Sequence, residues 1–293
     1  MADIKSIQNR INSVKDTRKI TNAMYLISST KLRKARKSLD ETSPFFRKLR
    51  QEIGNIIDMG LADQSRYILS DEEKANGELK GRCGILVITA DKGLAGPYNQ
   101  HVIDQTLALM QEHQDHELFV VGEYGRHYFT SHNIKINPDF VYSDMDPTLY
   151  DARMIAGAVM DRFDRGELCA IYCVYTHFQT AISSEAVCIQ MMPFEKDYFA
   201  QYSTDTKTEE FEYIPSALDV LEHCIPVYCI GMIYSMLVYS FCCEQNDRMM
   251  AMDSDNKNAD KLLDELTLRY NHLRQDSITQ EIIEVSSSMK AGH

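Results

Sequence analysis

Apolar residues at alternating spacings of three and four keep one helical register through the first 57 residues. The members of this stripe are Ile4, Ile7, Ile11, Val14, Leu32, Ala35, Leu39, Phe46, Leu49, Ile53 and Ile56. A stripe of this length predicts a single helix of roughly 80 Å that packs along another helix, because each residue adds about 1.5 Å. Between Val14 and Leu32 the same register falls on Arg18, Thr21, Tyr25 and Ser28. These polar residues therefore pack either against a polar stretch of another helix or against a different molecule.

Charge is distributed unevenly between the first 50 residues and the rest. The first 50 carry thirteen Lys and Arg against four Asp and Glu, whereas the whole chain of 293 residues has a net charge of −12. The basic run from Lys31 to Lys37 is either a solvated helix face or a surface for nucleic acid, an anionic membrane or an acidic protein. We favour the protein partner, because a chain that is acidic overall is a poor non-specific binder of nucleic acid.

The middle of the chain, from residue 80 to residue 210, follows a different pattern. Short apolar runs at 83–89, 118–122, 169–175 and 186–192 alternate with helical stretches at 99–113, 123–130 and 148–163. Buried strands that alternate with helices predict an α/β domain with a mainly parallel sheet. The polar stretch 70–77 reads as a connector, and Pro44 is expected to bend or break the first helix.

Helical spacing returns from Pro215, which suits a first helical position. The segment 224–243 has no charged residue and is long enough to cross a membrane, but Pro226, Gly231 and the lack of a basic flank favour a buried helix. Beyond it lies an apolar stripe formed by Leu262, Leu266, Tyr270, Leu273, Ile278, Ile282 and Val285. We expect the helix that carries this stripe to pack against the first helix. We therefore expect a discontinuous antiparallel pair of helices (residues 1–60 and 215–293), with the α/β domain inserted between them in the sequence.

Candidate chemistry is sparse. The loop Asp91–Pro97 lies at a strand end but lacks the phosphate-binding pattern of glycines and lysine, and Pro97 removes a backbone N–H. A tight turn is favoured there over a nucleotide site. The nine His show no spacing typical of zinc sites or catalytic pairs, and the eight Cys, mostly in apolar runs, are expected to be buried thiols. We expect no catalytic residue, no cofactor and no metal.

Three segments resemble one known family, the gamma subunit of bacterial F-type ATP synthase. They are residues 11–35 (INSVKDTRKITNAM followed by STKLRKA), residues 89–99 (TADKGLAGPYN) and residues 248–284, which contain RMMAM and LTLRYNHLRQDSITQEIIE. The resemblance covers nearly the whole chain. It implies a long antiparallel coiled coil of the N- and C-terminal helices with an inserted Rossmann-like α/β domain.

The resemblance further implies a non-catalytic rotor shaft with four kinds of partner. In this family the coiled coil runs up the centre of a hexamer of alpha and beta subunits, while the α/β domain lies against the epsilon subunit and the ring of c subunits. Proton-driven rotation of the ring turns the shaft and takes the three beta sites through different affinities. The implied location is the cytoplasmic face of the cell membrane, with membrane contact only through the c ring and no nucleic acid. The coupling ion, proton or sodium, stays open.

The resemblance assigns roles to three groups of residues. Arg274, Gln275 and Thr279 match the family positions that bond to a beta-subunit loop. A basic shaft face would meet acidic beta loops; its members are Arg10, Lys15, Arg18, Lys19, Lys31, Arg33 and Lys34. An apolar bearing end would lie in the collar at the top of the hexamer; its members are Ile278, Ile282, Val285 and Met289. The alternatives are a basic coiled coil that binds nucleic acid, a membrane anchor through 224–243, and a diverged paralogue with other partners.

Overall fold

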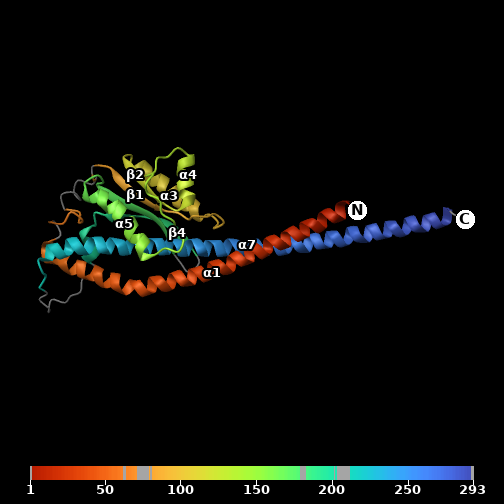
Figure 1. Ribbon diagram of the computed structural model, residues 1–293, viewed down its shortest axis with the longest axis horizontal. Coiled ribbons are helices and arrows are strands. Elements are labelled where there is room, and N and C mark those ends of the chain that lie inside the picture. The colour runs from red at the N-terminus through yellow and green to blue at the C-terminus, as the bar shows by residue number, and fades with distance from the viewer. Residues whose placement is uncertain are drawn as a thin grey trace. The chain divides into compact units, whose positions relative to one another are not determined.

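The computed structural model describes residues 2–61, 64–70, 79, 81–178, 183–200, 202 and 212–291 (Figure 1). Its contacts divide the chain into two compact units. The helical-pair unit comprises Met1–Ser29 and Arg248–His293, and the sheet unit comprises Thr30–Asp247. Both ends of the chain thus contribute to one unit.

Two long helices run through both units. Helix α1 spans Ala2–Ile56 and helix α7 spans Ala217–Ala291. The assignment of α1 continues through Pro44, so the local break considered there is absent. After α1 a π-helical turn, η1, covers Ile57–Leu61, where Gly60 has a φ of 81° that an L side chain would resist.

Helix α7 begins two residues later than the sequence suggests. Pro215 was expected at the first helical position, but α7 starts at Ala217. The Ser216 hydroxyl accepts a hydrogen bond from the backbone N–H of Asp219 at 3.1 Å and donates one to the Asp219 carboxylate at 2.6 Å. The prediction for Pro215 was wrong because this serine cap, rather than the proline, satisfies the free N–H groups of the first turn.

The helical-pair unit is antiparallel and has an apolar seam followed by a polar one. Ile7 and Ile11 of α1 pack with Leu263 and Leu266 of α7. Further along α1, the Thr21 hydroxyl donates to the Asn256 side-chain oxygen at 2.5 Å, and Arg18 pairs with Asp260 at 3.0 Å. The polar stretch of the first helix therefore meets a polar stretch of α7, which was one of the two alternatives.

The sheet unit is built on four strands in the order β2-β1-β3-β4. Their bounds are β1 Cys83–Ile88, β2 His116–Val121, β3 Ala170–Phe178 and β4 Ser184–Met192. Strand β1 pairs in parallel with β2 and with β3, whereas β4 is an antiparallel edge strand beside β3. The expected mainly parallel sheet is confirmed.

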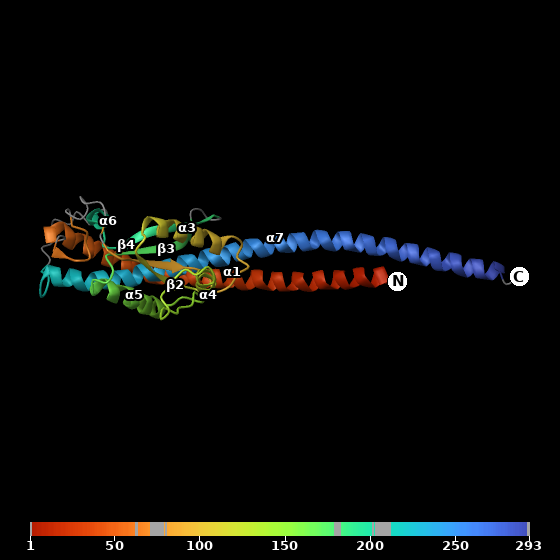
Figure 2. The ribbon, with the colours of Figure 1, turned by 90° about the horizontal axis from the view of Figure 1, so that it is seen from above.

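Helices cover both faces of the sheet. They are α3 Tyr98–Glu112, α4 Glu123–Ser131, α5 Leu149–Asp164 and the short α6 Lys196–Ala200. Figure 2 shows α3 and α5 on opposite sides of the strands. Alternate residues of β1 separate the two cores: Ile85 and Val87 pack with α3 and α4, while Leu86 and Ile88 belong to the core of α5, α7 and the second half of α1. This alternation follows from the two-residue period of a strand.

The uncharged segment 224–243 belongs to this second core. Ile225, Cys229, Ile233, Leu237 and Phe241 are each at most 2% exposed. Helix α7 is the one helix in the described part of the chain with the length and apolar composition of a membrane span, and 67% of its apolar window is buried inside the protein. A core helix explains this pattern, because its apolar residues have partners within the same chain.

A buried tyrosine makes the stability of the sheet unit sensitive to high pH. The Tyr67 hydroxyl donates to Asp164 at 3.0 Å, accepts from Arg66 at 3.2 Å, and its ring stacks on Phe163. Burial and the Asp164 contact raise the pKa of Tyr67 from 10.0 to about 12. The unfolded chain therefore loses this proton first, so the stabilisation is complete below pH 10 and is lost as the pH rises from 10 to about 12.

Replacing Tyr67 by Phe is expected to lower the free energy of unfolding by about 2 kcal/mol at neutral pH, because the hydroxyl's hydrogen bonds with Asp164 and Arg66 are both lost. The unfolding midpoint of the Tyr67→Phe variant in urea is also expected to vary less between pH 10 and pH 12 than that of the unaltered chain. Tyr150→Phe, which removes a hydroxyl from a side chain that is 70% exposed, serves as the control. Equal changes in the two variants would contradict the assigned role of the Tyr67 hydrogen bond.

Candidate partner-binding surfaces

The C-terminal end of α7 extends past the start of α1. Thr21 lies opposite Asn256, and Arg18 lies opposite Asp260. Continued along two antiparallel helices of equal rise, this register places Ala2 opposite about residue 275. Figures 1 and 2 both show α7 continuing beyond the N-terminus of α1. The last turns of α7 therefore have no described residue of α1 to pack on.

This end of α7 exposes apolar side chains. Ile278 is 45% exposed, Ile282 is 63% exposed and Val285 is 56% exposed. Ile283, which lies outside the apolar stripe of α7, is 59% exposed beside them. Met289 lies within α7, but its side chain is outside the described residues. Large apolar side chains gathered at helical spacing on an exposed surface are typical of a protein-binding site.

Of the three residues expected to bond to a partner loop, two lie just before this apolar end and the third, Thr279, follows its first residue. Arg274 and Gln275 are exposed on α7, and so is Thr279. The Thr279 hydroxyl donates to the backbone carbonyl of Gln275 at 2.8 Å. The long side chains of Arg274 and Gln275 are thus available in solvent, and α7 places the three residues within two helical turns of one another.

The expected basic face is partly neutralised by contacts within the chain. Arg18 pairs with Asp260, and Lys19 pairs with Asp16 at 2.9 Å. In the sheet unit, the Lys31 ammonium lies 3.8 Å from Asp146 and 5.5 Å from the centre of the Phe241 ring. Arg10, Lys15, Arg33 and Lys34 are exposed and have no ion pair with a described residue, whereas Arg18 and Lys19 are exposed but ion-paired. Sequence could not reveal these pairings, because each except Lys19–Asp16 joins residues far apart in the chain.

Polar side chains in and beside the loop after β1 form hydrogen bonds within the sheet unit. Asp91 accepts a hydrogen bond from the backbone N–H of Glu123 at 3.0 Å and another from the Ser143 hydroxyl. Thr89 donates to the carbonyl of Val121 at 2.8 Å, and Asn99 accepts from the N–H of Ala90 at 2.9 Å. The favoured interpretation of this loop as a tight turn before a helix agrees with α3 beginning at Tyr98.

Two features of the sheet unit could not be seen in the sequence. The thiols of Cys83 and Cys169 lie 3.8 Å apart, because β1 and β3 pair in parallel and place Cys83 beside Ala170. Burial and the neighbouring Cys169 raise the pKa of Cys83 to about 12. The second feature is a cavity between α1, α7 and the sheet edge that contains two arginines. In the part of the chain that the structure describes, no group of three or more His, Cys, Asp or Glu could hold a metal ion.

These features define the class of proteins in which two paired terminal helices carry an inserted α/β domain and present an exposed helix end to partners. The chain belongs to the ATP synthase gamma chain family. The family model described as ATP synthase matches residues 3–291. The gamma chain of Ruminiclostridium cellulolyticum is 36% identical over 296 residues, covering 99% of this chain and 98% of that protein. The sodium ion specific gamma chain of Acetobacterium woodii is 30% identical, with 99% and 98% covered.

Solved structures share the fold. A chain from the structure of Euglena gracilis mitochondrial ATP synthase, OSCP/F1/c-ring, matches with a TM-score of 0.65 and 16% identity, covering 100% of this chain and 95% of that one. A chain from the Tetrahymena thermophila mitochondrial ATP synthase central stalk and c-ring matches with a TM-score of 0.57 and 21% identity, covering 80% and 98%. At these identities the likeness supports the architecture of helices and sheet.

Proposed function

We propose that this chain is the rotor shaft of an F-type ATP synthase and transmits torque between an ion-driven c ring and a catalytic hexamer of alpha and beta subunits. Family membership supports the proposal, since the curated relatives are ATP synthase gamma chains. The observation that carries it is the end of α7, where exposed apolar residues extend beyond α1. An apolar surface on a helix is suited to turning within a collar because its contacts are non-directional.

In this proposal each surface makes its own contact within the complex. Arg274, Gln275 and Thr279 bond to a beta-subunit loop, and the bearing end turns within the hexamer. The exposed cations Arg10, Lys15, Arg33 and Lys34 face acidic loops, where charge complementarity favours correct docking more than affinity. The segments 1–60 and 215–293 form the shaft. The inserted domain, residues 80–210, meets the epsilon and c subunits at the cytoplasmic face of the membrane.

The shaft itself would catalyse nothing, and ATP chemistry would occur in the beta and alpha subunits. This division of labour is consistent with the loop after β1, whose Asp91, Thr89 and Asn99 are engaged in bonds within the fold. The coupling ion is open, since the relatives include a gamma chain described as sodium ion specific and others without that description.

The test is recovery of the tagged full chain from its own cells, followed by an assay of Mg-ATP hydrolysis on the eluate. We expect alpha and beta subunits to be recovered together with ATPase activity. Recovery of nucleic acid, or of membrane proteins without alpha and beta, would contradict the proposal. A binding strength that falls steeply with salt would then identify nucleic acid as the partner of the basic residues.

A further inference from the structure

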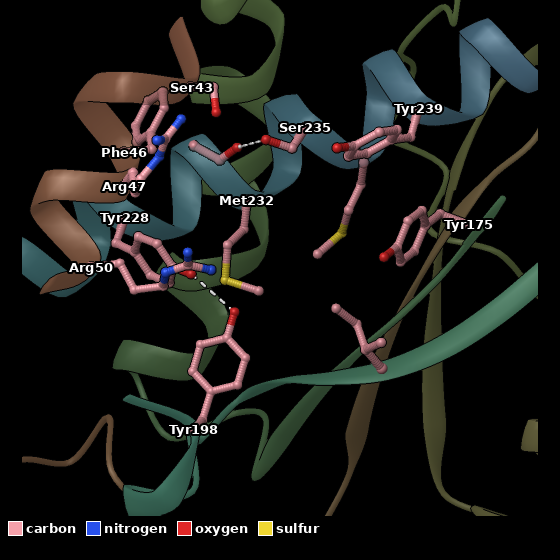
Figure 3. Close-up of a pocket in the computed structure, with 13 residues that line it drawn as sticks. Ser43, Phe46, Arg47, Arg50, Tyr175, Tyr198, Tyr228, Met232, Ser235 and Tyr239 are labelled. Carbon is pink, nitrogen blue, oxygen red and sulfur yellow. Dashed lines mark hydrogen bonds between the residues drawn. The ribbon is translucent and has the colours of Figure 1, made fainter. Parts of the chain in front are cut away.

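A cavity of about 320 Å³ lies in the sheet unit between α1, α7, α6 and the strands β3 and β4. Figure 3 shows Arg50 with Tyr198 and Tyr228 on one side of it, and Tyr175 with Tyr239 on the other. This volume falls within the range of pockets that hold small organic molecules. The residues that line the cavity lie outside the three segments that mark the family, and the proposed rotor function does not use it.

The charge of the cavity is positive in a chain that is acidic overall. Arg47 and Arg50 line it, and no Asp or Glu is among the described residues of the lining. The Nε of Arg50 is buried and has no hydrogen-bond acceptor. Neither guanidinium has an ion pair with any residue that the structure describes. A buried N–H of a cationic group that lacks a hydrogen-bond acceptor costs free energy of folding. The buried Nε–H of Arg50 therefore points to an anionic ligand that supplies the acceptor.

Arg50 is held in place by an aromatic ring. Its guanidinium carbon lies 3.5 Å from the centre of the Tyr202 ring. Arg47 is three residues earlier on α1 and therefore lies on the same side of the helix. Two guanidinium groups at this spacing offer several N–H donors with a planar geometry, which matches the oxygens of a phosphate better than a single ammonium would.

The walls of the cavity are aromatic and carry neutral hydroxyl groups. The hydroxyls of Tyr198 and Tyr228 are hydrogen-bonded to each other at 2.9 Å. Burial raises the pKa of Tyr228 despite the opposing effect of Arg50, and burial raises the pKa of Tyr175 to about 12. The phenols of Tyr228 and Tyr175 therefore stay protonated at neutral pH and do not repel an anion. Their ring faces can stack against a flat organic group.

We propose that this cavity binds a phosphate monoester of an aromatic compound, with the phosphate at Arg47 and Arg50 and the ring between the tyrosines. The ligand class follows from the aromatic walls combined with two guanidinium groups that have no ion pair with a described residue, one of them with a buried Nε that lacks an acceptor. Inorganic phosphate would satisfy only the arginines, and an uncharged aromatic alcohol would satisfy only the tyrosines. The full ligand is therefore expected to bind more tightly than either part.

Calorimetric titration of the purified full chain with phenyl phosphate tests the proposal. We expect saturable binding at least tenfold tighter than that of inorganic phosphate or phenol. Arg47→Ala, which alters an exposed side chain, and Arg50→Ala are each expected to weaken phenyl phosphate binding about tenfold or more, because each removes charge-assisted hydrogen bonds.

Lys48→Ala is the matched control, since Lys48 is an exposed cation of the same helical turn that does not line the cavity. Its affinity for phenyl phosphate is expected to match that of the unaltered chain, and thermal melting confirms that each variant is folded. The proposal is overturned if phenyl phosphate shows no saturable binding at millimolar concentration. It is also overturned if folded Arg47→Ala binds as the unaltered chain does, or if Lys48→Ala weakens binding equally.

Discussion

Replacing Arg274 and Gln275 together by alanine is expected to reduce ATP-driven ion transport by the assembled complex at least tenfold. Both side chains are exposed on α7, so their loss removes no packing within the chain. The effect therefore arises at the proposed contact with a beta-subunit loop, where lost hydrogen bonds to a charged group are each worth about 1.5–3 kcal/mol. The measurement is ATP-driven uptake of the coupling ion by inverted membrane vesicles, followed as acidification for protons or as labelled sodium, with the amount of assembled complex determined in parallel.

The control for this variant is Arg269→Ala, which removes an exposed cation one and a half turns earlier on α7. Ion transport in the control is expected to stay near that of the unaltered complex. Full transport by the double variant would refute the role assigned to Arg274 and Gln275. An equal loss in the control would mean that general charge on α7, rather than a specific contact, supports coupling.

Replacing Gly231 by Ala is expected to destabilise the sheet unit by about 2 kcal/mol. A Cβ at this position would overlap the ring of Phe46, because α1 and α7 approach closely there. Alanine favours a helix over glycine by about 1 kcal/mol, but overpacking of a core costs about 1–3 kcal/mol and more where the overlap is severe. The overlap involves three ring atoms, so the packing cost is expected to exceed the helix gain.

Gly157→Ala provides a control with the opposite sign. Gly157 lies inside α5, and a Cβ there would meet no atom within 4 Å. This variant is expected to stabilise the protein by up to about 1 kcal/mol through helix propensity alone. Urea unfolding of both variants measures the difference. If the Gly231→Ala variant were as stable as the Gly157→Ala variant, the close packing of Phe46 of α1 on Gly231 of α7 would be contradicted.

A double replacement isolates the contact itself. Phe46→Ala removes the ring that the new Cβ would meet, so the cost of Gly231→Ala is expected to be smaller in a Phe46→Ala background. The coupling between the two positions, obtained from the four free energies of unfolding, measures the overlap. Independent, additive effects would place the cost of Gly231→Ala elsewhere in the fold.

Much of the fold was predictable because its signals are local and periodic. The stripe from Ile4 to Ile56 specifies one face of a long helix, and the apolar runs specify the strands of the sheet. The start of α7 was missed because the cap at Ser216 outweighs the preference of Pro215 for a first turn. Leu263 was missed as a seam residue because spacing identifies a face but not which of two adjacent leucines is the more buried.

The surfaces were predictable in part. The resemblance to a family assigned roles to Arg274 and the apolar end of α7, whereas periodicity alone identified only a helix there. The pairing of Lys31 with Asp146 and the meeting of Cys83 with Cys169 depend on tertiary structure. The cavity between Arg50 and Tyr175 likewise arises where α1, α7 and the sheet meet, so no short segment of sequence carries a signal for it.

Single-molecule observation of the assembled complex tests the central claim most directly. The alpha and beta subunits are fixed to a surface, a bead is linked to the sheet unit of this chain, and Mg-ATP is added. The rotor account predicts rotation of the bead in one direction, with a rate that follows ATP hydrolysis. A complex that hydrolyses ATP while the bead stays still would contradict the account.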